Sequence, residues 1–209
     1  MRCILLAAPA LCLASTSGLA ANLDPGAAEL ARAAREGAII AARREGYPLK
    51  GYVLYDVPDT QAIDTASGAV DAVVVGTPFE RARHTAYLSA YEGRPAAANL
   101  STELPSGHVA IIVFGRGPDD EDKSFKDRFG KAALTFDTGE RLEAVAEPSD
   151  ADEAVYPRAP APRKRMIATI TYRFDLRSIH DPGVRSARLA FVDSSGKAFD
   201  LLLDFRRYR

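Results

Sequence analysis

The sequence predicts a mainly β protein, an antiparallel β-sandwich with an N-terminal helix and an inserted helix near residues 78–92. Two observations favour this fold class. Apolar and polar residues alternate over residues 165–176 and 199–205, as in strands that bury one face. Short apolar segments separated by Gly, Pro and Asp recur along the chain, without the regular strand–helix alternation of a parallel sheet. An α+β arrangement is the alternative.

Residues 1–20 have the pattern of a signal peptide, with Arg2 before a short apolar segment and small residues around Ala20. The apolar segment is too short to be a permanent membrane span. Both cysteines, Cys3 and Cys12, lie in this segment, and Leu11 disfavours a lipid anchor at Cys12 because a small residue is usual there. We therefore expect a periplasmic or secreted mature chain without disulfides or thiolate ligands.

The remaining chain divides into a helical segment, residues 21–48, and a β-rich globular domain, residues 49–209. Asp24 and Pro25 are typical of a helix start, and the Ala-rich run after them is expected to end at Gly46. Its apolar stripe consists mostly of alanines. Such a stripe predicts either close packing against another element or loose attachment.

The β-rich segment reads as a series of strands with one helix. Strands are expected at 52–57, 69–75, 109–114, 133–137, 141–146 and 165–176, followed by a hairpin that ends the chain. Thr77 and Glu80 have capping-box spacing around Pro78, which predicts the helix at 78–92. Residues 147–165 are acidic, then Pro-rich, then basic, and predict an extended solvated connection.

This architecture looks similar to the immunoglobulin-like domains of secreted bacterial proteins. The resemblance is architectural only, because the chain has no Trp and so lacks the Cys…Trp…Cys core of antibody domains. It implies a binding or structural module.

Composition and motifs exclude several function classes. The chain has 27 Lys and Arg against 28 Asp and Glu, whereas a nucleic-acid binder is usually basic overall. Neither the zincin pattern nor a Gly-x-Ser-x-Gly turn occurs. His84 is expected at the surface of its helix. His108 and His180, with Asp181 nearby, are the remaining candidates for a hydrolase or metal site. We assign no catalytic residue, metal or cofactor.

Two charged groups are candidate sites. A basic interaction patch would form if two stretches came together, namely Arg163, Lys164 and Arg165 with Arg206, Arg207 and Arg209. A calcium loop is the second candidate, because carboxylates suit hard cations and cluster at Asp119, Asp120 and Asp122, although EF-hand spacing is absent. Strand-edge protection and a solvated acidic loop, respectively, are the simpler explanations.

These observations predict an exported, non-enzymatic binding or structural module that acts through protein or envelope contacts. A cell-envelope hydrolase and an anionic-surface binder that uses the basic stretches are the alternatives. We expect a protein partner in the envelope, no nucleic-acid partner, and no transmembrane span once residues 1–20 are removed.

Overall fold

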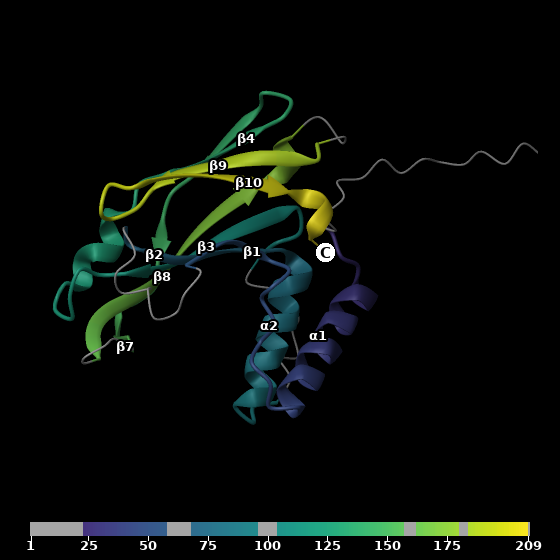
Figure 1. Ribbon diagram of the computed structural model, residues 1–209. Helices are drawn as coiled ribbons and strands as arrows, with labels where there is room; N and C mark the ends of the chain where they lie inside the picture. The colour runs from purple at the N-terminus through teal and green to yellow at the C-terminus, as the bar shows by residue number, and fades with distance from the viewer. Residues whose placement is uncertain (1–22, 58–67, 96–103, 157–161, 180–183, 209) are drawn as a thin grey trace, which may run out of the picture.

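The computed structural model describes residues 23–57, 68–95, 104–156, 162–179 and 184–208, so the expected signal peptide lies outside the described residues. The chain forms two antiparallel sheets in two layers, with a pair of helices beside the larger one (Figure 1). Sheet A has the strand order β1-β2-β3-β8-β6, and β7 also pairs with β8. Sheet B has the order β10-β9-β4-β5. The predicted mainly β, antiparallel class is confirmed at this level.

The elements follow one another in chain order. Sheet A contains β1 (Val53–Asp56), β2 (Val70–Gly76), β3 (His108–Arg116), β6 (Glu147–Pro148), β7 (Asp152–Tyr156) and β8 (Arg163–Asp175). Sheet B contains β4 (Ala132–Phe136), β5 (Arg141–Ala144), β9 (Ser186–Val192) and β10 (Ala198–Asp204). The helices are α1 (Ala27–Ala42) and α2 (Pro78–Tyr91), and the short 3₁₀ turns are η2 (Lys123–Arg128), η3 (Leu176–Ser178) and η4 (Phe205–Arg207).

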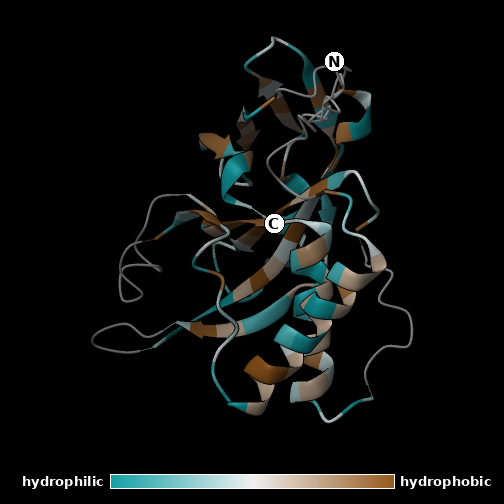
Figure 2. Ribbon diagram, turned by 90° about the vertical axis from the view of Figure 1, so that its right-hand side faces the viewer, coloured by the Kyte–Doolittle hydropathy of each residue, from teal (hydrophilic) through white to brown (hydrophobic). Residues whose placement is uncertain are grey.

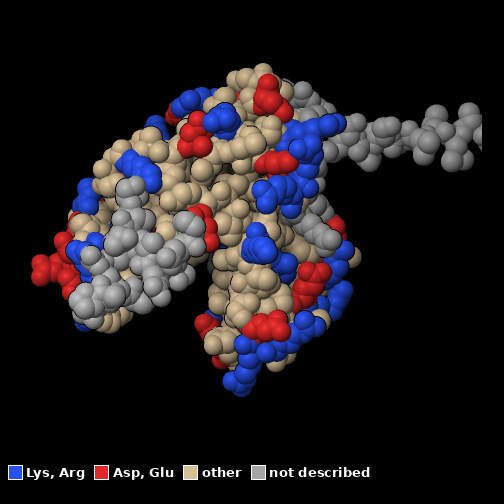
Figure 3. Space-filling model, in the orientation of Figure 1, with Lys and Arg blue, Asp and Glu red and all other residues tan. Residues whose placement is uncertain are grey.

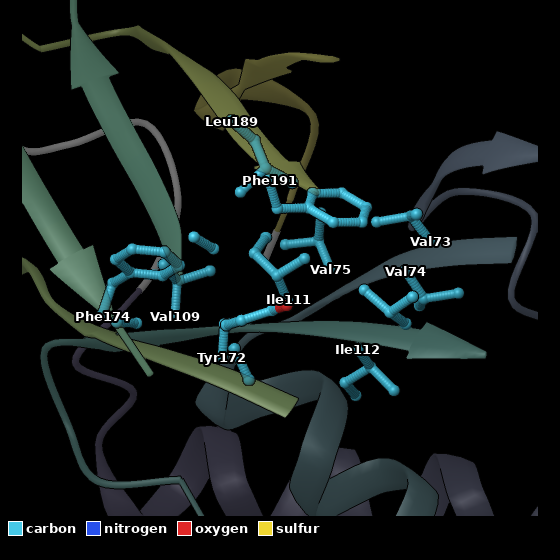
Figure 4. Close-up of a cluster of buried hydrophobic side chains, with 14 of the residues drawn as sticks. Val73, Val74, Val75, Val109, Ile111, Ile112, Tyr172, Phe174, Leu189 and Phe191 are labelled. Carbon is cyan, nitrogen blue, oxygen red and sulfur yellow. The ribbon is translucent and has the colours of Figure 1, made fainter. Parts of the chain in front are cut away.

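The main core lies between the two sheets. Ile111 on β3 is opposite Tyr172 on β8, and both side chains are fully buried. The ring centroid of Tyr172 lies 5.9 Å from that of Phe191 on β9. The two sheets pack against each other through this contact. Figure 4 shows Leu189 and Phe191 on the Ile111 side of the sheet and Ile112 on the other side. Because strand side chains alternate, sheet A therefore has a second face that points away from sheet B.

The segment 147–165 corrects the sequence prediction, because it is not only a solvated connection. Its acidic part forms β6 and β7, which both pair with β8. Lys164 Nζ lies 2.9 Å from Glu153 Oε1, and Arg173 Nη1 lies 2.6 Å from Glu147 Oε2. The acidic residues that suggested a solvated chain therefore suit β6 and β7, because both strands pair with β8, which carries basic residues.

Helix α1 begins later and ends earlier than predicted. Gly26, rather than Asp24, is the N-cap, and its carbonyl accepts from the backbone N–H groups of Glu29 and Leu30 at 3.0 Å each. The last helical residue is Ala42, whereas the helix was expected to continue as far as Gly46. Among the described helices, neither length nor hydropathy reaches what a bilayer crossing requires.

The two helices pack closely because α1 presents small residues to α2. Ala33, Gly37 and Ala41 are the buried residues of α1, and Ala33 forms a small core with Phe79 and Ala82 of α2. Figure 2 looks onto this pair, where hydrophilic and hydrophobic residues are interspersed along both helices. The predicted start of α2 is confirmed: the Thr77 hydroxyl accepts from the Glu80 N–H at 3.2 Å, and Pro78 is the first helical residue.

A buried polar cluster attaches α2 to the segment that follows α1. The Tyr47 hydroxyl donates to Glu80 Oε1 at 3.1 Å and accepts from Arg83 Nε at 3.0 Å. Glu80 is 1% exposed, and its Oε2 atom has no hydrogen-bond partner among the described residues. Burial raises the pKa of the Glu80 carboxyl, while Arg81, the Tyr47 hydrogen bond and Arg83 oppose that rise. The carboxyl is therefore easier to protonate in the folded chain than in the unfolded one.

We expect Glu80→Gln to stabilise the protein increasingly as the pH rises above the ordinary carboxyl pKa of 4.5. Below that value both states hold the proton. Above it the unfolded chain releases the proton more readily than the folded chain, so wild-type stability falls until the raised pKa is passed. Gln has no proton to release. Urea unfolding at about pH 5 and pH 8 should show that the free energy of unfolding of Glu80→Gln exceeds that of the wild type by more at the higher pH. The control is Glu92→Gln, at an exposed position. A Glu80→Gln variant that is equally destabilised at both pH values would contradict this prediction.

Candidate functional site

The structure does not bring the two basic stretches together. Arg163, Lys164 and Arg165 begin β8, where they pair with β7, whereas Arg206 and Arg207 form η4 near the C-terminus. β7 and the C-terminal end lie on opposite sides of the molecule (Figure 1). Arg165 is only 8% exposed. Arg209 lies outside the described residues. The combined basic patch is therefore not present as a single surface.

The acidic loop uses its carboxylates within the loop itself. Asp119 Oδ1 accepts from the backbone N–H groups of Glu121 and Asp122, at 3.0 and 2.8 Å. Asp122 accepts from the Ser124 N–H at 3.1 Å and pairs with Arg128 at 2.6 Å, and the hydrogen bond from Arg128 lowers the pKa of Asp122 to about 2. Asp120 is exposed. Within the described part of the chain, no group of three or more His, Cys, Asp or Glu residues is placed to hold a metal ion.

His84 and His108 have different surroundings in the structure. His84 is half-buried, and its ring lies edge-on to Tyr47 with centroids 4.7 Å apart. His108 Nε2 lies 4.0 Å from Asp175 Oδ2, and its Nδ1 is 3.1 Å from the Ser106 carbonyl oxygen. His180 and Asp181, the other members of the predicted hydrolase site, lie outside the described residues.

The outer face of sheet A forms the floor of a cleft. On β3 its residues are Ala110, Ile112 and Phe114, which pair with Arg173, Thr171 and Thr169 on β8. Ile112 is 9% exposed, whereas Phe114 is 39% exposed, although it belongs to the central strand pair of the sheet. Aromatic residues are enriched at protein interfaces, which makes the exposed Phe114 a candidate contact residue.

Two hollows run along this floor and meet at Thr169. One, of about 90 Å³, lies under the first turn of α2 and is bounded by Arg81, Leu104 and Arg173. The other, of about 170 Å³, surrounds Phe114 and is bounded by Asp150 and Asp152 near the edge strands. Figure 3 shows the molecule hollowed between the helical pair and the end of sheet A that carries β7. The cleft thus has an apolar and β-branched floor, with arginines at one end and aspartates at the other.

A hydrogen-bonded cluster fixes the acidic end of the cleft. Asp71 on β2 accepts from Arg116 on β3 and, at 2.5 Å, from the Tyr156 hydroxyl on β7. Arg116 is 3% exposed and also donates to the Gly68 carbonyl at 2.9 Å. Burial, followed by the hydrogen bond to Asp71, raises the pKa of Tyr156, so the phenol stays neutral. One carboxylate therefore ties three strands of sheet A together.

The side chains along this surface are chemically mixed. Along the described lining, the side chains are apolar, hydroxyl-bearing or charged. The sequence predicted that Phe114 lies in a strand but not that it is exposed. Six consecutive apolar residues show no alternation that would tell which side chains face the core. Comparisons with protein-family models, with curated proteins and with solved structures found no match for this chain.

Proposed function

We propose that this protein is an exported, non-enzymatic binding module that holds an extended segment of a partner protein in the cleft on the outer face of sheet A. The observation that carries the proposal is the exposed Phe114 in the middle of that face. We further propose that the two-layer core belongs to the immunoglobulin-like class and serves as the scaffold for this surface. Periplasmic or secreted localisation, which the residue pattern of 1–20 suggests, is part of the same proposal.

The chemistry of the cleft supports a polypeptide as its occupant. Phe114 and Ile112 offer apolar contact, while Thr169 and Thr171 place β-branched side chains beside them. Arg81 and Arg173 border one end, and Asp150 and Asp152 border the other. An extended segment with an apolar side chain at its centre, an acidic residue toward α2 and a basic residue toward β7 would complement this pattern. Such charges chiefly set orientation and association rate, while the apolar centre provides most of the affinity.

Site-specific photocrosslinking in intact cells tests this proposal. We expect a photoreactive phenylalanine analogue at position 114 to crosslink to one protein reproducibly. The matched control is the same analogue at position 202. Leu202 is 62% exposed on β10, and it lies on the outer face of the other sheet. Crosslinking to the same proteins from both positions, or none from position 114, would contradict the proposal.

A further inference from the structure

A second cavity lies at the end of the sandwich where five segments meet. It has a volume of about 220 Å³ and is separate from the cleft. The start of β2, the end of β3, η2, the start of β8 and the β9–β10 turn all contribute to its wall. Its lining consists of Gly68, Ala69, Arg116, Gly117, Pro118, Arg128, Arg165, Ser194 and Ser195.

The charge on this wall is of one sign. Three arginines line the cavity, and none of the described lining residues is acidic. Arg116 and Arg165 are 3% and 8% exposed, so their guanidinium groups are held by the fold rather than free to move in solvent. Three cationic side chains in the wall of one small cavity favour an anionic ligand there.

The carboxylates that balance these arginines lie outside the lining. Asp71 holds Arg116, and Asp122 holds Arg128, with Arg128 Nη2 2.6 Å from Asp122 Oδ2. Arg165 donates to the carbonyl oxygens of Gly117 and Pro118. These contacts fix the direction of each guanidinium in advance, which lowers the entropy lost when a ligand binds.

A buried aspartate positions the hydroxyl side of the cavity. Asp193 is 2% exposed, and its Oδ2 accepts from the Ala69 N–H at 2.6 Å, which joins the β9–β10 turn to the start of β2. Its Oδ1 accepts from the Ser195 N–H and hydroxyl, at 2.9 and 2.7 Å, and from the Lys197 N–H at 2.9 Å. These contacts hold Ser195 in the wall of the cavity.

We propose that this cavity binds a phosphate group, either as a free small phosphate or as the phosphate of a small ester. Several guanidinium groups suit an oxyanion with many acceptor atoms, because each guanidinium carries five N–H donors. The volume is smaller than that of sites for drug-sized ligands, which favours a small anion. This inference does not depend on the proposed partner in the cleft, and either can fail without the other.

Calorimetric titration of the purified mature chain with inorganic phosphate and with glycerol 3-phosphate tests the site. We expect at least one of them to bind, and Arg128→Gln to weaken that binding by about tenfold, the value of one charge-assisted hydrogen bond. Arg128 is exposed, so this change should leave the fold intact. Binding of the phosphate alone identifies a free anion as the ligand, and binding of the ester alone identifies an esterified one.

The matched control is Arg188→Gln. Arg188 forms a comparable exposed pair with Asp200, at 2.7 Å, on sheet B and away from the cavity. We expect the affinity of Arg188→Gln for the phosphate probes to equal that of the wild type. Arg165→Lys should weaken binding as well, because it keeps the charge but loses the planar fork. Absence of binding by both probes at millimolar concentration would overturn the proposal, and so would equal losses in Arg128→Gln and Arg188→Gln.

Discussion

Gly37→Ala should separate the two helices and destabilise the protein by about 1–3 kcal/mol, the usual cost of overpacking. A β-carbon at Gly37 would overlap the Arg83 carbonyl oxygen and lie 2.9 Å from the Tyr87 backbone nitrogen. Both atoms belong to the α2 backbone, so no side chain can rotate away. The result would oppose intrinsic propensity, which favours Ala over Gly in a helix by about 1 kcal/mol.

Hydrogen exchange and thermal unfolding measure this effect together. Amides of α1 should lose protection in Gly37→Ala, and the unfolding midpoint should fall. Gly46→Ala is the control, because no atom lies within 4 Å of the added carbon and the residue is outside the helix. Retained protection of α1 in Gly37→Ala would show that the close helix contact is not formed as described.

Asp71→Ala should cost about 3 kcal/mol or more, because it removes the Asp71 carboxylate from its contact with the buried Arg116 guanidinium. Arg116 is 3% exposed, and the Tyr156 hydroxyl loses its acceptor in the same change. The loss of local stability should be largest where β7 joins the sheet, because Tyr156 is the contact between β7 and Asp71. Weak protection of β7 amides is therefore part of the expected result.

The comparison for this variant is Asp200→Ala, which breaks the exposed pair with Arg188. Both partners there are more than half exposed, and exposed pairs contribute about 0–1 kcal/mol. Urea unfolding of the two variants should differ by about 2 kcal/mol or more. Similar small losses in both would mean that Asp71 does not act as the tie between β2, β3 and β7.

Local patterns in the sequence predicted most of the strands and the start of α2. The alternation of apolar and polar residues predicted β8 and β10, and the spacing of Thr77, Pro78 and Glu80 predicted the start of α2. β6 and β7 were missed because acidic residues are depleted in strands. Their partner in the chain is basic, as the Lys164–Glu153 and Arg173–Glu147 pairs show. An acidic stretch shortly before a basic strand was the signal that could have indicated them.

The two proposed binding surfaces could not be predicted in the same way, because they depend on strand order and register. The cavity proposed to bind phosphate joins Gly68, Arg116, Arg128, Arg165 and Ser195, which are far apart in sequence. Only Arg165 was among the predicted site residues, and Arg206 and Arg207, which were expected beside it, lie elsewhere. The sequence did not indicate that Phe114 is exposed either, because a one-residue change of strand register would have pointed its side chain toward the core.

The affinity of the partner crosslinked at position 114, measured with purified proteins, tests most directly whether the outer face of sheet A is the binding surface. Phe114→Asp should weaken binding by about 30-fold, as expected when an aromatic residue at the centre of an interface is lost. Leu202→Asp, on the opposite outer face, should bind like the wild type. Equal affinities for Phe114→Asp and the wild type would contradict the account.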